Sequence, residues 1–365
     1  MNDSSPGFSP TRRSLLATVG LVAGAGILGA CSSGSGGSST SPSLPQRLLD
    51  RTEVVVALGS TSIVAPFDPV QGWGKTGVNP FHRTLLAADT SNAIVTDLAT
   101  GYTISEDKLT WTFTLRDDVT FSDGTKLTSE DVAFTYNKAK EAAKVTLPGF
   151  DHATSVDPTT VELKLSKPSS VLLYTAATLG IVPAASYSED YGDHPIGAGP
   201  WTFVEYIQGQ QLIIQRNDNY QGDKPGFGKA TILMMDPDAA LAAVKAGQVD
   251  LGCTYPNLSG QKVNGYSLVC LPTFDYRVIS LPCQPPGAWQ VDGQEVGNAV
   301  TSDRDIRRAM AFALNRRQLI DESLQGYGEV AFDMFDAFEW GIKADTVSLT
   351  DGDVAGGKKI LDEAG

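Results

Sequence analysis

The chain has 365 residues, of which 28 are Lys or Arg and 42 are Asp or Glu, so its formal net charge is −14. Such an acidic chain lacks the basic residues that neutralise phosphates, which argues against a nucleic-acid-binding protein. Hydrophobic residues make up 41% of the chain, enough to build folded cores and to exclude global disorder. The length predicts two or three domains. The three histidines, His82, His152 and His194, are too scattered to indicate a metal cluster.

The first 30 residues have the features of an export signal. Arg12 and Arg13 precede an apolar run that reaches Ala30, and this run is shorter than the roughly 20 residues that span a bilayer. The adjacent arginines resemble a twin-arginine signal. The run ends in LGAC at residues 28–31, which resembles a bacterial lipobox. That resemblance implies cleavage before Cys31 and lipid attachment to its sulfur, the alternative being a generic signal with a coincidental cysteine.

Residues 31–50 are rich in Ser, Gly and Pro, which predicts a tether between the signal and the folded part of the chain. The remaining cysteines are Cys253, Cys270 and Cys283. Export permits one disulfide among them, and buried free thiols are an equal alternative. No pair has the C-x-x-C spacing of a zinc or redox site.

Apolar and alternating segments in the body of the chain predict β-strands. A short apolar run at residues 53–59 indicates a buried strand. Polar and apolar residues alternate at 109–115 and again at 161–165, which predicts two half-buried strands. Residues 201–206 and 212–216 predict a hairpin around a glycine. With the helices predicted between them, these strands indicate an α/β fold.

Capping residues mark the predicted helices. Thr128, followed three residues later by Asp131, fits a capping box. Asp303 is placed to cap one helix over residues 304–324, with Met310 among the residues of its apolar face. The glycines of 197–200 precede a strand, so they predict a bend and not a nucleotide-binding loop. Two further helices are predicted at residues 238–246, ending at Gly247, and 358–364, ending at Gly365.

A series of segments in fixed order resembles family 5 of the extracytoplasmic solute-binding proteins, the peptide-, dipeptide- and nickel-binding family of ABC importers. The most specific is DKLTWTFTLRDDVTFSDGT at residues 107–125, which continues through LTSEDV at 127–132. The further matches are IGAGP at 196–200, QRNDNY at 215–220, AVKAGQVD at 243–250, RRAMAFALNR at 307–316 and LDEAG at 361–365. Their common order makes a chance resemblance improbable.

The resemblance implies a bilobal α/β architecture of the type II periplasmic-binding-protein kind, which closes on its ligand by hinge motion. It implies a first lobe at residues 51–230, with an inserted subdomain at about 83–190. Residues 231–365 are then the start of a second lobe. Because members of the family continue well beyond the last matched segment, the resemblance implies that this second lobe is incomplete.

Three residues are candidates for lining a ligand cleft. Trp73 stands between two glycines, a position poorly suited to core packing, and Tyr276 and Arg277 lie on a predicted strand of the second lobe. Packing or surface roles are the alternative for each. No catalytic residue is predicted, because the chain has no Gly-x-Ser-x-Gly elbow and no recognisable arrangement of Cys or His.

These observations predict a lipid-anchored solute-binding protein on the outer, periplasmic side of the cell membrane. It is expected to be a monomer that captures a small solute, above all a peptide, between two lobes and delivers it to an ABC permease. No enzymatic activity, cofactor, metal or nucleic-acid partner is expected. The alternatives are a secreted hydrolase, a sensor or other non-transport lipoprotein, and a non-functional gene fragment.

Overall fold

The computed structural model describes residues 51–61, 63, 65–74, 79–89, 93–271, 276–331 and 351–365. These residues divide into two compact units, of which the first ends at Thr254 and the second begins at Tyr255. The first unit thus extends past residue 230, where the second lobe was expected to begin. The predicted signal, lipid-attachment residue Cys31 and tether all lie outside the described residues.

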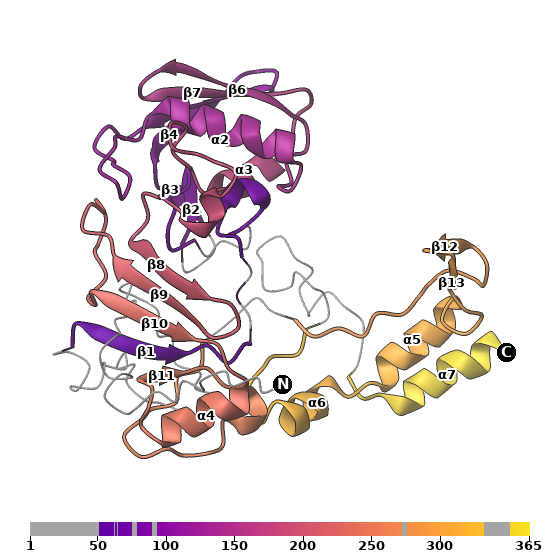
Figure 1. Cartoon of the computed structure of the whole chain (residues 1–365). Coiled ribbons are helices and arrows are strands. Elements are labelled where there is room, and N and C mark those ends of the chain that lie inside the picture. The colour runs from indigo at the N-terminus through magenta and orange to yellow at the C-terminus, as the bar shows by residue number, and fades with distance from the viewer. Residues whose placement is uncertain are drawn as a thin grey trace, which may run out of the picture. The chain divides into compact units, whose positions relative to one another are not determined.

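The main sheet of the first unit has five strands in the order β11-β1-β10-β9-β8 (Figure 1). β1 is parallel to both of its neighbours, whereas β9 is antiparallel to β10 and β8. The strands are β1 (Glu53–Ala57), β8 (Trp201–Ile207), β9 (Gln211–Arg216), β10 (Lys229–Leu233) and β11 (Leu251–Gly252). The predicted buried strand and hairpin are therefore confirmed. Helix α4 (Pro237–Lys245) connects β10 to β11 and packs against β11, which explains why the unit continues beyond residue 230.

A second, antiparallel sheet is inserted in the sequence between β1 and β8, with the strand order β4-β5-β7-β6. Both strands predicted from alternating residues belong to it. The inserted elements are β2 (Leu86–Ala88), β3 (Ile94–Thr96), β4 (Ala99–Ile104), β5 (Thr110–Leu115), α2 (Ser129–Ala142), β6 (Phe150–Asp157), β7 (Thr160–Leu165) and α3 (Val171–Thr178). Two 3-10 helices complete the unit, η1 (Pro69–Gln71) and η2 (Tyr191–Asp193).

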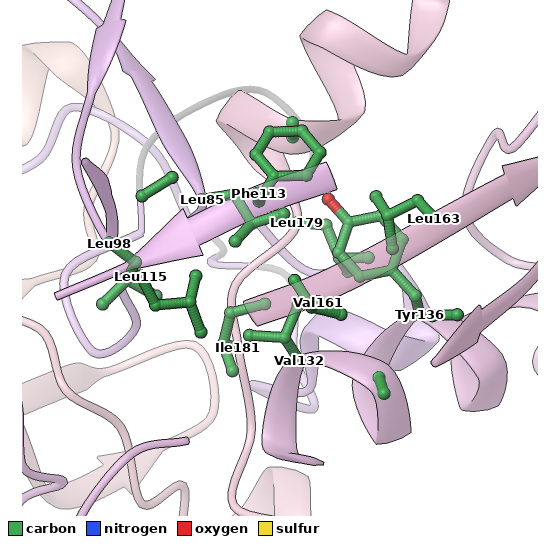
Figure 2. Close-up of a cluster of buried hydrophobic side chains, with 14 of the residues drawn as sticks. Leu85, Leu98, Phe113, Leu115, Val132, Tyr136, Val161, Leu163, Leu179 and Ile181 are labelled. Carbon is green, nitrogen blue, oxygen red and sulfur yellow. The ribbon is translucent and has the colours of Figure 1, made fainter. Parts of the chain in front are cut away.

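Helix α2 covers the inserted sheet and closes a hydrophobic core. Figure 2 shows Val132 and Tyr136 of α2 facing Val161 and Leu163 of β7. Phe113 of β5 is completely buried in the same cluster. Each large apolar side chain removed from water in this way contributes roughly 1.5–3 kcal/mol to stability, so the alternation seen in the sequence is what holds this sheet to its helix.

The predicted capping box at the start of α2 is confirmed. The backbone N–H of Thr128 donates to the Asp131 carboxylate at 2.8 Å. The other oxygen of that carboxylate accepts a hydrogen bond from the backbone N–H of Ala184 at 2.9 Å. One side chain therefore fixes both the helix start and a loop more than fifty residues away in the sequence.

The predicted bend before β8 is confirmed, and its glycines are required by close packing. A Cβ atom on Gly197 would lie only 1.9 Å from the carbonyl oxygen of Phe81. The backbone N–H of Gly199 donates to that same oxygen at 2.8 Å, and the carbonyl of Gly197 accepts from the N–H of Ser122 at 2.9 Å. Any side chain at Gly197 would push these backbone segments apart.

The second unit is built mainly from helices. Its elements are η3 (Pro256–Leu258), the hairpin β12 (Trp289–Val291) and β13 (Gln294–Val296), and the helices α5 (Arg304–Ala313), α6 (Arg316–Ser323) and α7 (Val354–Ala364). Helices α5 and α7 pack together, and a Cβ on Gly357 would come within 2.8 Å of the Ala309 carbonyl oxygen. Helix α7 ends at Gly365 as predicted but begins earlier, because Asp353 caps it.

The prediction of one helix over residues 304–324 is wrong. Leu314 is extended, with ψ at 122°, and separates α5 from α6. The side chain of Asn315 then caps α6 by accepting a hydrogen bond from the backbone N–H of Gln318 at 2.9 Å. Asparagine favours such a cap over a helix interior because its side chain competes for backbone hydrogen bonds. Met310, predicted on the apolar face, is 45% exposed.

Cys253 and Cys283 are exposed free thiols, so neither the predicted bridge nor the predicted burial describes them. In the part of the chain that the structure describes, no helix is long and apolar enough to cross a membrane.

Candidate functional site

The carboxyl ends of β1, β10 and β11 meet at one edge of the main sheet because these three strands are parallel. Ligands of open α/β sheets bind at the carboxyl ends of parallel strands. We call the residues that follow these strands, namely 58–61, 234 and 253–254, the carboxyl edge. This edge is the candidate functional site of the first unit.

Backbone contacts hold the carboxyl edge together. The N–H of Leu58 donates to the Leu233 carbonyl, and the N–H of Cys253 donates to the Ala57 carbonyl, both at 2.9 Å. Gly59 has a φ of +68°, and a Cβ on it would lie 2.6 Å from the carbonyl oxygen of Cys253. A glycine is therefore required here, and its absent side chain lets the loop after β1 approach the end of β11.

The carboxyl edge contains a buried hydroxyl without a hydrogen-bond partner in the described part of the chain. The Oγ1 atom of Thr254 is buried and has no hydrogen-bond partner among the described residues. Buried polar atoms are nearly always satisfied by protein, water or ligand. Ser60 and Thr61, which follow β1, are exposed at the same edge. These hydroxyl groups are suited to hydrogen bonding a polar solute.

Trp73 belongs to an aromatic cluster joined to the loop after β1. Its ring lies 5.2 Å from that of Phe67, edge to face, and stacks on Phe81 at 5.5 Å. Phe67 also meets the ring of Tyr206, whose hydroxyl donates to the carbonyl oxygen of Ile63 at 3.0 Å. Trp73 is thus packed, which is the alternative left open by the sequence, and it remains only half-buried. Its role as a ligand contact stays a prediction.

His82 adjoins this cluster but is not arranged for catalysis. Its ring nitrogens lie 3.0 Å from the Asn79 side-chain oxygen and 2.6 Å from the Tyr191 hydroxyl. Complete burial lowers the pKa of His82 to about 3, so the ring is neutral at pH 7. A neutral, buried imidazole held by an amide and a phenol has a structural role.

A hollow of about 730 Å³ lies elsewhere in the first unit, beside the buried carboxyl group of Asp68. The hydroxyl of Tyr187 donates to this carboxyl at 2.7 Å, and the backbone N–H of Val70 donates at 2.8 Å. Burial raises the pKa of Asp68 against the opposing effect of these hydrogen bonds. None of the predicted ligand residues lines this hollow.

Tyr276 and Arg277 lie in the second unit and are exposed, Tyr276 by 46%. The strand predicted there is not formed, since residues 276–281 have no regular secondary structure. Trp73 therefore belongs to one unit and these two candidates to the other. The fourth named residue, Cys31, lies outside the described residues.

The sequence analysis missed the residues of the carboxyl edge. The Gly-Ser-Thr sequence at residues 59–61, where the apolar run ends, was a usable signal, because it marks the end of a buried strand. Thr254 gave no such signal, since the strand before it, β11, has only two residues. Among the described residues there is no group of three or more His, Cys, Asp or Glu placed to hold a metal ion.

Comparison with known proteins identifies the family. Residues 93–365 match the model of bacterial extracellular solute-binding proteins, family 5 Middle. Protein XP55 of Streptomyces lividans is 31% identical over 330 residues, which are 85% of this chain and 57% of that protein. The glutathione-binding protein GsiB of Escherichia coli is 26% identical over 297 residues, 76% of this chain and 55% of that protein.

The fold is also similar to solved structures. The crystal structure of NikZ from Campylobacter jejuni, in complex with Ni(L-His), superposes with a TM-score of 0.71 at 22% identity. The match covers 86% of this chain and 63% of NikZ. The chain thus spans little more than half the length of the two curated relatives. Its fold is that of the bilobal type II periplasmic binding proteins, and the chain belongs to family 5 of the bacterial extracellular solute-binding proteins.

Proposed function

We propose that this chain is part of a lipid-anchored binding protein that captures a small solute outside the cytoplasm and delivers it to an ABC permease. Membership of family 5 supports the transport role. The observation that carries the solute site is the buried, unpartnered Thr254 hydroxyl at the carboxyl edge. This atom lies at the carboxyl ends of the parallel strands, where open sheets bind their ligands. It makes no hydrogen bond among the described residues.

We further propose that the solute is a peptide or an amino-acid derivative. The names of two similar proteins support this class, because one binds glutathione, a tripeptide, and the other was solved with a nickel–histidine complex. The hydroxyl groups at the carboxyl edge would hydrogen-bond the amide and carboxylate groups of such a solute. The half-buried ring of Trp73 would supply an apolar contact.

Ligand-induced thermal stabilisation of the full chain tests this proposal. Glutathione, dipeptides, histidine and the nickel–histidine complex are the probes, since a ligand that binds only the folded state raises the melting temperature. Thr254→Val removes the hydroxyl while keeping the side-chain shape, and we expect it to weaken binding about tenfold, the effect of one lost hydrogen bond of 1–1.5 kcal/mol.

The matched control is Thr202→Val on β8, whose hydroxyl donates to the Gln215 carbonyl away from the carboxyl edge. The control should bind as the wild type does. Failure of every probe to stabilise the wild type contradicts the proposed solute class. Equal binding by Thr254→Val and the wild type contradicts the proposed location. Hydrolysis of simple ester or peptide substrates would contradict the proposal that the protein binds its solute without catalysing a reaction.

The lipid anchor is a separate proposal that depends on Cys31. Mass spectrometry of the protein extracted from membranes should show an N-terminus at Cys31 that carries a diacylglyceryl mass. Cys31→Ser should abolish that mass, whereas Cys283→Ser, which changes an exposed free thiol, should leave it. An unmodified N-terminus in the wild type would overturn the proposal.

A further inference from the structure

The hollow of about 730 Å³ beside Asp68 has the size of a ligand site, since pockets for small organic molecules measure about 300–1,000 Å³. Residues of α2, η1 and η2 line it. It is accessible from solvent through an acidic mouth, which we define as the exposed residues Glu189, Asp190 and Asp193 of its lining. The lining shares no residue with the carboxyl edge or with the aromatic cluster of Trp73, so the hollow is distinct from the candidate solute site.

Asp68 places a buried carboxylate on the lining of this hollow. The residue is only 4% exposed. Its side chain accepts hydrogen bonds from the hydroxyl of Tyr187 at 2.7 Å and from the backbone N–H of Val70 at 2.8 Å. No Lys, Arg or His in the described part of the chain forms an ion pair with it. A buried charge is normally paired with an opposite charge, so Asp68 lacks the cation that its burial calls for.

Close packing of η2 holds the acidic mouth next to Asp68. A Cβ atom on Gly192 of η2 would lie 3.2 Å from the Cβ of Asp68. The carbonyl oxygen of Gly192 accepts a hydrogen bond from the backbone N–H of Phe67 at 2.8 Å. Asp190 and Asp193 lie on either side of this glycine in the sequence. The missing side chain therefore lets these two carboxylates stand at the entrance to the pocket that Asp68 lines.

The charges on the lining favour a ligand with more than one positive charge. Four carboxylates line the hollow, namely Asp68, Glu189, Asp190 and Asp193. Lys138 supplies the one ammonium group on the lining, and its Nζ atom lies 3.0 Å from the carboxylate of Glu141, which is outside the hollow. Carboxylates gathered in a concave site concentrate a negative potential and attract cations.

Two further observations indicate that this cation is an extended organic molecule. Among the described residues no group of three or more His, Cys, Asp or Glu is placed to hold a metal ion, so the four carboxylates do not converge on one inorganic cation. The half-buried rings of Phe134 and Tyr187 also line the hollow and pack edge to face, 5.3 Å apart. Aromatic rings bind both methylene groups and ammonium groups.

We propose that this hollow binds a linear polyamine, a chain of several ammonium groups joined by short methylene segments. One ammonium group pairs with the buried carboxylate of Asp68, and the others pair with the carboxylates of the acidic mouth. The methylene segments pack against Phe134 and Tyr187. Such a ligand supplies the missing cation, matches the excess of carboxylates and is long enough to reach from the interior of the hollow to its entrance.

Spermine binding to the full chain, measured by isothermal titration calorimetry with the ionic strength held constant by sodium chloride, tests the proposal. Asp68→Asn should weaken spermine binding at least about tenfold, because it removes one partner of a buried charge pair. The asparagine keeps an oxygen that can accept the hydrogen bonds of Tyr187 and Val70. Asp193→Asn, at the exposed mouth, should weaken binding severalfold without affecting the fold.

The matched control is Asp223→Asn, which removes the same charge from an exposed aspartate of the first unit that lies outside the hollow. This variant should bind spermine as the wild type does. The proposal is overturned if spermine does not bind the wild type, if a folded Asp68→Asn binds it equally well, or if Asp223→Asn weakens binding as much as Asp193→Asn. The last comparison decides the question even if Asp68→Asn does not fold. Tighter binding of Mg²⁺ than of spermine would overturn the choice of ligand.

Discussion

The two units of this chain contrast in how much apolar surface they bury. The first unit has a contiguous core in which side chains such as Phe113, Leu163 and Tyr136 are completely buried. In the described part of the second unit, Ala309 and Ile320 are the only buried hydrophobic side chains. Because hydrophobic stabilisation grows with the area removed from water, the first unit holds most of the described chain's stability.

The second unit also exposes large apolar side chains near Tyr276 and Arg277, where a strand was predicted and is not formed. Val278 and Ile279 are 64% and 66% exposed, and Leu271 is similarly exposed. A β-patterned segment gains stability only from neighbours that cover it or pair with it. We therefore expect the second unit to open at lower free energy than the first and to be digested first in limited proteolysis.

The largest expected effect comes from deleting core volume in the first unit. Phe113→Ala should lower its free energy of unfolding by about 3–5 kcal/mol, because the ring is fully buried and leaves a cavity. Met310→Ala, a change of a large apolar residue in the second unit, should cost less than about 1 kcal/mol since that side chain is 45% exposed.

Hydrogen exchange resolved by residue is the measurement, because it reports the two units separately. The loss from Phe113→Ala should appear in the amides of β5 and β7. Similar losses from the two substitutions would show that the second unit is as well packed as the first, and the contrast between the units would then be wrong.

A smaller effect is expected from the aspartate that holds α6 in the second unit. Asp351 accepts hydrogen bonds from the backbone N–H groups of Arg316 and Arg317, at 2.9 and 3.1 Å, and forms an ion pair with the Arg316 side chain at 3.0 Å. Asp351→Ala removes all of these, and we expect a local loss of about 2 kcal/mol in the exchange protection of α6.

Asp321→Ala is the control for Asp351→Ala. Asp321 pairs with Arg317 on the exposed surface of α6, so its loss should cost no more than about 0.5 kcal/mol. Equal losses from both substitutions would mean that α6 is held by its own helix contacts and not by the segment around Asp351.

The elements that could be predicted from the sequence are those fixed by residues close together in the chain. The alternation at 109–115 specified β5, and Thr128 with Asp131 specified the start of α2. The glycines at 197–200 correctly indicated a bend. The capping residues are close together both in the sequence and in space. The alternation at 109–115 shows directly which side of the strand is buried.

The features that could not be predicted depend on partners far away in the chain. The break between α5 and α6 is stabilised by Asp351, 35 residues after Arg316. The packing of Trp73 depends on Phe67 and Phe81, and the carboxyl edge depends on three strands that only the folded sheet brings together. The local sequence pattern carries no information about contacts between residues that are far apart in the chain. Thr254 was therefore not recognised.

The pH dependence of stability should distinguish the units, because the buried histidine belongs to the first. Burial lowers the pKa of His82 to about 3, whereas an unfolded histidine titrates near 6.5. Between these values the unfolded chain binds the proton more readily, so stability falls as the pH drops from 6.5 towards 3. From pH 7.5 to 5.5 we expect a loss of about 1.4 kcal/mol from this residue.

Urea unfolding of the wild type and of His82→Gln at both pH values measures this contribution. The glutamine cannot ionise, so the variant should lack this part of the pH dependence. His152→Gln replaces an exposed histidine and is the control for the substitution itself. An unchanged pH dependence in His82→Gln would show that His82 has the same pKa in the folded and unfolded states, and the lowered pKa would then be wrong.

The smallest expected effect comes from removing the cap of α5, and it tests whether the two units unfold independently. Asp303 caps α5 by accepting hydrogen bonds from the backbone N–H groups of Asp305 and Ile306, at 2.7 and 3.2 Å. Asp303→Ala should cost about 1 kcal/mol, detected as faster exchange of the first-turn amides of α5. Because this helix is in the unit with little buried surface, the loss should leave the protection of β5 unchanged. If β5 is also destabilised, the two units unfold together, and their unequal burial does not divide the chain into independent parts.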